Sequence, residues 1–287
     1  MYASVATKDP TAVEVAVQTA YLEMFPCADR LFIPQVFGWA IDCFTGQYDG
    51  YQPIDAKYHD FEHTLQGALC MARLLRGRHL AKTTPSLSER LFQLGMIAIL
   101  FHDTGYLKQN EDIEGTGAKY TVIHVRRSAD FAAMFLKGKH FLPEDIKAVQ
   151  NMILCTGINA PLDRIPFKGE AEKITGFALG TADLLGQMAA DDYVEKLPVL
   201  YSEFAEAASY EKDKTSIIGM FSSAEDLRQK TPAFWEKYVQ LKLNRDFGGL
   251  YRFCNDPYPF GPNYYWQRVE ANIQRLRNEL AAGGKTV

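Results

Sequence analysis

The stretch that decides the fold is Leu91-Phe-Gln-Leu-Gly-Met-Ile-Ala-Ile-Leu-Phe-His102-Asp103-Thr-Gly105. It is an apolar run that ends in two polar residues and a glycine. The part from 94 to 101 is too short to cross a bilayer, because a spanning helix needs about 20 apolar residues. The stretch therefore predicts a core helix whose end carries His102 and Asp103 out of the apolar interior.

Two more segments place a metal-ligand type of side chain in an apolar helical run. In Tyr58-His-Asp-Phe-Glu-His63-Thr-Leu-Gln-Gly-Ala-Leu the apolar residues recur at three- and four-residue steps, the period of a buried helical stripe. His59 and His63 lie four apart, so they share one helix face and can converge on one ligand. In Ile174-Thr-Gly-Phe-Ala-Leu-Gly-Thr-Ala-Asp183 a single carboxylate lies within the run.

The apolar neighbours of Asp103 and Asp183 are the physical argument for a metal. An ionised Asp among apolar side chains is costly unless it is paired or coordinating, and no Lys or Arg lies within four residues of Asp183. Each residue by itself is more simply explained as a satisfied core or capping group. Together, His63, His102, Asp103 and Asp183 supply two imidazoles and two carboxylates, which suit Mg²⁺, Mn²⁺, Fe²⁺, Zn²⁺ or Co²⁺.

The order of these four residues resembles the H…HD…D signature of the HD superfamily of metal-dependent phosphohydrolases. Three segments are also similar to class I cyclic nucleotide phosphodiesterases. They are Tyr58-His-Asp-Phe-Glu-His63, Val149-Gln-Asn-Met-Ile-Leu-Cys-Thr156 and Thr181-Ala-Asp-Leu184. The resemblance covers residues 58–205. It implies an HD-type helical bundle that cleaves a phosphoester, with a cyclic or linear nucleotide as the first substrate to expect.

The resemblance also implies residue roles. The four signature residues would hold the first metal, and Asp103 would bridge to a second, for which His124 is the candidate ligand. His59 would be the general acid that protonates the leaving oxygen. Tyr106 stands where the phosphodiesterases have a further His, and Cys155-Thr156 stands where fully dinuclear HD proteins have their later His ligands. We therefore expect a second metal site that is poor in protein ligands.

Substrate contacts are less well marked in the sequence. Arg126 and Arg127 follow His124 and could neutralise a phosphate through forked hydrogen bonds, although a solvated helix face explains the pair equally well. The aromatic-rich stretch 247–266 could stack a nucleobase, but such stretches more often form core and lid. No glutamine near the C-terminus can be matched to the one that reads the base in the phosphodiesterases.

Composition predicts one all-α domain. The chain has 287 residues, of which 47% are hydrophobic, and no linker or alternating apolar and polar run interrupts it. We expect a helical extension over 1–57, a metal-binding core over 58–210, and C-terminal helices with an aromatic lid over 211–287. The helices expected outside the segments quoted above begin after Pro10, at Pro143, and over 124–136, 170–190, 192–207, 224–243 and 264–281.

Charge and cysteine content limit partners and compartment. A net charge of −4 offers no basic surface for duplex nucleic acid, so we do not expect a nucleic-acid partner; the resemblance implies a small-molecule phosphoester instead. The first ten residues lack the apolar segment of a signal peptide, and the five cysteines include no Cys-x-x-Cys pair, as is typical of reduced thiols. We expect a cytoplasmic protein that does not enter a membrane; a homodimer is compatible with the sequence.

Two other function classes compete with the phosphohydrolase. Some HD proteins with two irons are oxygenases, and the spacing of His124 after His102 suits one, but that chemistry needs a full second iron site, which Cys155-Thr156 does not supply. The other class is a binding module, such as a nucleotide sensor or scaffold, that keeps the metal and has lost catalysis. His59 argues against the scaffold, since binding alone requires no proton donor at that position.

Overall fold

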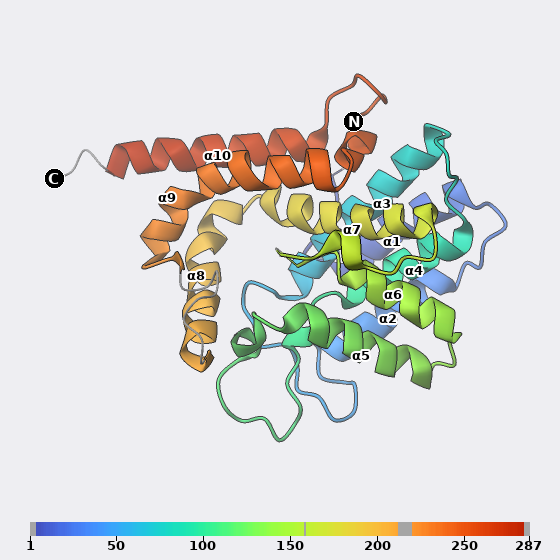
Figure 1. Cartoon of the computed structure of the whole chain (residues 1–287), viewed down its shortest axis with the longest axis horizontal. Coiled ribbons are helices and arrows are strands. Elements are labelled where there is room, and N and C mark those ends of the chain that lie inside the picture. The colour runs from blue at the N-terminus through green and yellow to red at the C-terminus, as the bar shows by residue number, and fades with distance from the viewer. Residues whose placement is uncertain (1–3, 158, 212–219, 284–287) are drawn as a thin grey trace.

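Helices α3 (Phe61–Leu80) and α7 (Glu170–Met188) cross at the centre of the molecule (Figure 1). The structure is a computed structural model that describes residues 4–157, 159–211 and 220–283. Glycine makes this close crossing possible: a Cβ atom on Gly186 would lie 2.9 Å from the backbone carbonyl of Gln66. Gly186 follows Asp183 by three residues, and Gln66 follows His63 by three. The crossing therefore brings the side chains of Asp183 and His63 together, one helical turn from the point of contact.

The other helices surround this pair. Eight more α-helices lie in the described residues: α1 (Pro10–Met24), α2 (Phe32–Phe44), α4 (Glu89–Phe101), α5 (His124–Gly138), α6 (Pro143–Ile153), α8 (Tyr193–Tyr210), α9 (Ala224–Phe234) and α10 (Tyr264–Gly283). Shorter 3₁₀ or π segments are η1 (Thr104–Tyr106), η2 (Gly117–Tyr120), η3 (Leu162–Arg164), η5 (Trp235–Val239), η6 (Lys242–Asp246) and η7 (Leu250–Cys254). Within the described residues there is no β-strand, only two isolated bridges. The predicted all-α single domain is confirmed.

Side-chain caps fix where the helices begin. Asp60 accepts a hydrogen bond from the backbone N–H of His63 at 2.9 Å and starts α3, which sets His63 in the first turn. Ser88 starts α4 in the same way. Asp9 caps α1, because its side chain accepts a hydrogen bond from the backbone N–H of Thr11. Pro10 then occupies the first turn, where its missing N–H costs nothing.

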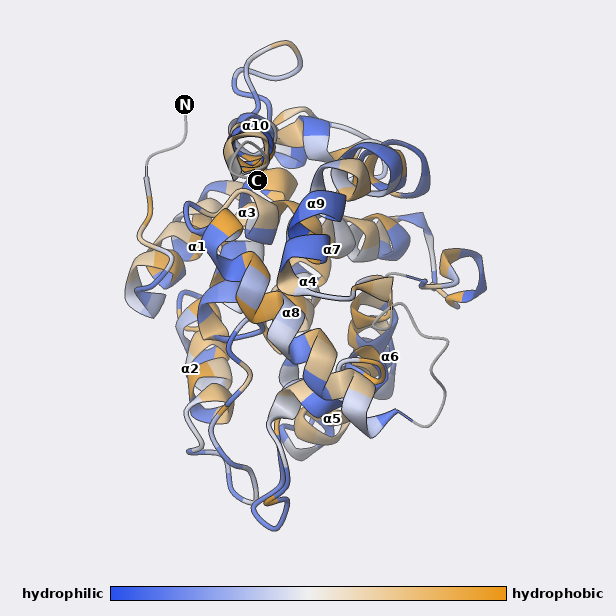
Figure 2. Cartoon of the chain, turned by 90° about the vertical axis from the view of Figure 1, so that its left-hand side faces the viewer, coloured by the Kyte–Doolittle hydropathy of each residue, from blue (hydrophilic) through white to orange (hydrophobic). Residues whose placement is uncertain are grey.

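A single hydrophobic cluster joins the helices. It includes buried residues of α1 and α2 at one end of the chain and of α10 at the other. Among the described α-helices, α2 alone was not predicted from the sequence. Figure 2 shows it as mostly hydrophobic, in contrast to the hydrophilic stretches of α9. None of the described helices is both long and apolar enough to cross a membrane.

Candidate metal centre

Four side chains from three parts of the fold converge on one point. Nε2 of His63, on α3, lies 3.2 Å from Asp103 Oδ2 and 3.2 Å from Asp183 Oδ1, on α7. Nε2 of His102, at the end of α4, lies 3.3 Å and 3.4 Å from the same two oxygens. Two ring nitrogens and two carboxylate oxygens therefore face one another in the order predicted from the sequence, and all four side chains are buried.

The burial of His102 and Asp103 corrects one expectation. The end of α4 does not carry them out of the interior, since each is only 1% exposed. The segment η1 turns back under them, and it can do so because Gly105 has no side chain: a Cβ there would lie 2.0 Å from the carbonyl oxygen of His124. The N-terminal end of α5 is thereby held beside the cluster, where Nε2 of His124 lies 3.8 Å from Asp103 Oδ1.

Backbone carbonyls fix which nitrogen of two histidines faces the cluster. Nδ1 of His102 lies 2.7 Å from the carbonyl oxygen of Ile99, and Nδ1 of His124 lies 2.5 Å from that of Thr121. A carbonyl oxygen only accepts, so Nδ1 must carry the proton in each ring. The neutral ring then has its lone pair on Nε2, the atom that points to the carboxylates, as a metal ligand requires.

The charged groups of the cluster shift one another's pKa values. Burial by itself would lower the pKa of His63, but the close carboxylates of Asp103 and Asp183 outweigh it and raise that pKa to about 10. Burial would raise the pKa of both aspartates, yet the two facing histidines hold these pKa values well below the usual range. The same negative charges that favour a proton on His63 would also favour a bound cation. Protons and a metal therefore compete for this site.

The donor set fits a divalent metal. His102 Nε2 and Asp103 Oδ2 are both buried, and neither makes a hydrogen bond of good geometry in the described part of the chain. Buried polar atoms without a partner are costly, and several of them aimed at one point are typical of a cation site. His63, His102 and Asp103 each offer a ligand atom, and these three atoms lie within 4.8 Å of one another. Asp183 adds a fourth.

Asp103 also faces a second group. Its Oδ2 atom points to His63 and His102, whereas its Oδ1 atom lies 3.8 Å from Nε2 of His124. The two oxygens of this carboxylate thus face two neighbouring places where a metal could bind, one beside His63 and His102 and a second beside His124. Cys155 and Thr156 do not add to the second position, because Sγ of Cys155 lies 3.5 Å from Asn151 O and the Thr156 hydroxyl donates to Ile153 O.

His59 lies beside the cluster and has a partner that the sequence interpretation missed. Its Nδ1 atom lies 2.6 Å from Oε2 of Glu203 on α8, and its ring centre lies 5.4 Å from that of His63. Burial would raise the pKa of Glu203, but the charge of His59 and the hydrogen bonds from Tyr58 and His59 keep it below its usual value. Glu203 therefore stays ionised. Its place in an ordinary amphipathic helix gave no sequence signal.

Tyr106 packs against both His59 and His124, whose own ring centroids lie 6.0 Å apart. Its ring stacks on both, with centroid distances of 4.5 Å to His59 and 4.7 Å to His124. The ring is fully buried, and its phenol oxygen makes no hydrogen bond of good geometry in the described residues. The hydroxyl of Thr121 lies nearby but donates to Ala118 O. Tyr106 thus packs against two candidate site rings at once.

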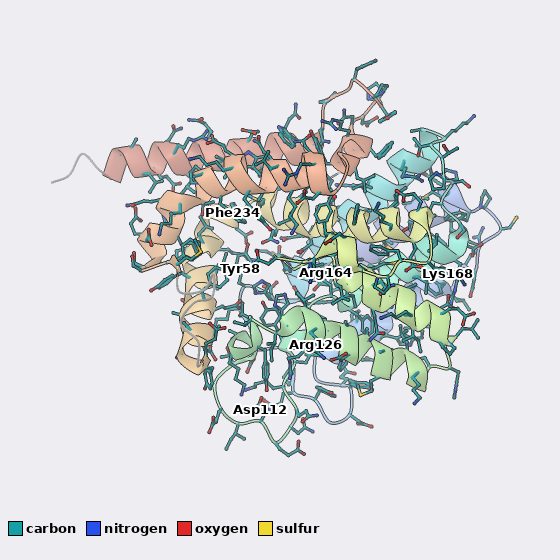
Figure 3. All side chains as sticks on the ribbon, viewed as in Figure 1. Tyr58, Asp112, Arg126, Arg164, Lys168 and Phe234 are labelled. Carbon is teal, nitrogen blue, oxygen red and sulfur yellow. The ribbon has the colours of Figure 1, made fainter. Side chains whose placement is uncertain are left out.

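The two predicted substrate-binding arginines have different surroundings. Arg127 donates from Nε to Gly105 O at 2.7 Å and from a terminal nitrogen to Leu107 O at 2.9 Å, and its guanidinium lies over the ring of Tyr120. It holds η1 against α5, and these contacts use its forked donors. Arg126 is exposed on α5 (Figure 3). Neither substrate-binding role is tested by these contacts, so both stay predictions.

The aromatic-rich C-terminal stretch is divided between core and surface. Phe247 is fully buried, packs on Phe177 at 5.5 Å and approaches Gly180, one turn before Asp183. Phe260, in contrast, is 97% exposed. The stretch therefore supplies packing behind α7, and base stacking by any of its rings stays a prediction.

A family model described as Npun_R2479-like matches residues 17–251. The chain belongs to the Npun_R2479-like family. The Npun_R2479-like match includes every residue of the centre described above, from His59 to Glu203, and it ends within η7, so α10 lies beyond it. No curated protein matches the chain.

Proposed function

We propose that this protein is a metal-dependent phosphohydrolase of the HD type that cleaves a phosphoester of a small molecule, with a cyclic or linear nucleotide as the first candidate. The observation that carries the proposal is the pairing of His59 with Glu203 directly beside the buried His and Asp cluster. A metal-binding scaffold needs ligands only. A hydrolase also needs a proton donor held at the leaving oxygen, and this arrangement supports one.

The residues divide into three groups. His63, His102, Asp103 and Asp183 would hold the first metal, and Asp103 with His124 would contribute to a second. A divalent metal held there supplies a water whose pKa is lowered to about 7 and, where two ions are present, a clamp for the attacking and leaving oxygens. Burial of the ligands by α4, α5 and α7 excludes bulk water and strengthens each charge interaction in the centre.

His59 acts on the leaving group in this proposal. Glu203 accepts a hydrogen bond from Nδ1, so the ring is held with Nε2 directed away from Glu203. The second proton of the ring, on Nε2, can then be given to the leaving oxygen as the phosphorus–oxygen bond breaks. The stack with Tyr106 holds the ring plane while that proton moves. Arg126, exposed two residues after His124, is the candidate contact for the phosphate.

The experiment is a substrate panel with the purified full-length protein. Cyclic nucleotides, nucleoside monophosphates and nucleoside triphosphates are each incubated with Mg²⁺, Mn²⁺, Co²⁺ or Fe²⁺, and released products are measured alongside iron content and oxygen uptake. We expect hydrolysis of at least one substrate, with loss of activity after chelation. Absence of hydrolysis across the panel contradicts the nucleotide proposal, and oxygen uptake by an iron-loaded sample would favour an oxygenase.

A further inference from the structure

A hydrogen-bonded chain of four residues, Asp183, Gln187, Tyr58 and Glu203, runs beside the candidate metal centre. Gln187, on α7, donates from Nε2 to Oδ1 of Asp183 at 3.3 Å and to the Asp183 backbone oxygen at 3.2 Å. Its Oε1 atom accepts a hydrogen bond from the Tyr58 hydroxyl at 2.8 Å. The backbone N–H of Tyr58 in turn donates to Oε1 of Glu203 at 2.7 Å, so Tyr58 bridges α7 and α8.

The amide orientation of Gln187 is fixed by its neighbours. Both oxygens of Asp183 that it meets can only accept, so the NH₂ end must face Asp183. The carbonyl end then faces the Tyr58 hydroxyl, which donates to it. Oδ1 of Asp183 is the atom that lies 3.2 Å and 3.4 Å from His63 and His102, so Gln187 contacts the coordinating oxygen itself.

We propose that Gln187 is a positioning residue of the metal centre: its amide, oriented by the Tyr58 hydroxyl, holds the Asp183 carboxylate in the direction that metal coordination requires. A carboxylate on a helix can rotate about its last bond, and a ligand that must first be ordered binds its metal less tightly. One lone pair of Oδ1 faces the histidines and another is satisfied by Gln187. The inference rests on the metal centre of the proposed function and not on its substrate.

The test is metal affinity, measured by calorimetry on full-length protein stripped with chelator and titrated with Mn²⁺. Gln187→Met keeps side-chain length and removes both the donor and the acceptor. We expect it to weaken Mn²⁺ binding by about 10- to 100-fold, the usual cost of losing a partner of a ligand. Tyr58→Phe removes only the group that orients the amide, so we expect a smaller loss of the same sign. The Co²⁺ absorption spectrum should shift in both variants.

Gln66 provides a matched control. It lines the same small cavity beside His63 as Gln187 does, but its side chain donates to Oε1 of Glu62 and not to a proposed ligand. Gln66→Met should bind Mn²⁺ as the wild type does. The double variant Tyr58→Phe/Gln187→Met should bind no more weakly than Gln187→Met alone, because the two residues act in series on one carboxylate.

The possible results distinguish failure of this inference from failure of the proposed function. Wild-type affinity in a folded Gln187→Met variant, or losses in Tyr58→Phe and Gln187→Met that add, would overturn the inference. Thermal unfolding in chelator shows whether each variant folds; if Gln187→Met does not, Tyr58→Phe carries the test, and wild-type affinity there overturns the inference too. Failure of every substrate in the hydrolysis panel, with the Mn²⁺ losses intact, would contradict the proposed function alone.

Discussion

His59 and Glu203 are 144 residues apart in the chain, and their side chains meet at 2.6 Å, Nδ1 to Oε2. The contact joins the segment that precedes α3 to the middle of α8. The same carboxylate accepts the backbone N–H of Tyr58 through its other oxygen. Glu203 therefore fixes both the ring and the backbone on which the proposed acid stands.

Replacing Glu203 should separate catalysis from metal binding. In Glu203→Gln only one side-chain oxygen remains for two donors, and the negative charge beside His59 is lost. We expect kcat to fall by about 10²-fold or more, within the range that a positioned acid contributes, while metal content stays at the wild-type level. Steady-state kinetics and elemental analysis measure the two quantities.

Glu206, one turn further along α8, is the matched control for Glu203. It accepts hydrogen bonds from the backbone N–H and hydroxyl of Thr116, away from His59. Glu206→Gln should leave kcat unchanged. Equal losses in Glu203→Gln and Glu206→Gln would mean that α8 responds to any lost carboxylate and that the His59 contact has no special role.

His59→Ala should keep the bound metal, whereas Asp103→Ala should lose it. His59 is not a ligand in the proposed centre, so His59→Ala should keep the metal and the fold and lose most of its turnover. The Asp103 carboxylate faces His63 through one oxygen and His124 through the other, so Asp103→Ala should lose the metal. Asp145, a buried carboxylate that pairs with Arg90, provides the control, since Asp145→Ala should retain metal. Equal metal content in Asp103→Ala and wild type would contradict the assignment.

The stability of the metal-free protein should depend on pH in a definite direction. The pKa of His63 is raised from 6.5 to about 10, so its contribution to the free energy of unfolding is complete below pH 6.5 and lost as the pH rises toward 10. The pKa values of Asp103 and Asp183 are lowered from 3.8, so their contribution is complete above that pH and lost on acidification. Stability in chelator should therefore be highest between these limits.

Bound metal should remove the loss of stability that the metal-free protein shows as the pH rises. A metal displaces the proton from His63, whose pKa in the metal-free protein is raised to about 10, so the added stability from Mn²⁺ should grow from pH 6 to pH 8, where that proton is still bound. Thermal unfolding with Mn²⁺ and with chelator, compared at each pH, measures it. A metal-induced shift that is the same at every pH would show that the metal binds away from the titrating histidine.

The phenol of Tyr106 and its ring should have separable roles. Tyr106→Phe keeps the stacks on His59 and His124 and removes a buried oxygen without a good hydrogen bond, so we expect wild-type stability and turnover. Tyr106→Ala should lower the free energy of unfolding by about 3 to 5 kcal/mol, as large-to-small changes of buried aromatic residues do. Denaturant unfolding measures both. A large loss of kcat in Tyr106→Phe would instead give the hydroxyl a role in the reaction.

The glycine crossing of α3 and α7 should be sensitive to one added methyl group. In Gly186→Ala the new Cβ would lie 2.9 Å from backbone atoms of Gln66 and Gly67, which cannot move aside as a flexible side chain can. We expect a loss of about 1 to 3 kcal/mol in the free energy of unfolding, together with weaker metal binding. Gly138→Ala meets nothing within 4 Å at the end of α5 and should be tolerated. Equal stability of the two variants would contradict the close crossing.

Local patterns in the sequence determined the helices and the candidate ligands. The apolar period of 91–101 and of the segment around His63 depends only on neighbouring residues, and it predicted helices that the structure contains at α4 and α3. Two carboxylates in apolar runs, with two histidines, likewise predicted the cluster in which His63 meets Asp103 and Asp183. Such signals are readable because burying a charge without a partner is costly wherever the helix packs.

Contacts between distant helices were decided only by the tertiary structure. Glu203 and Gln187 lie in ordinary helical sequence, and what gives them a role is the crossing of α7 and α8 with the segment around Tyr58. The burial of His102, expected at an exposed helix end, follows from the close approach of Gly105 to α5. Helical periodicity specifies which face of a helix is buried, whereas packing of complementary surfaces specifies which residue of another helix it meets.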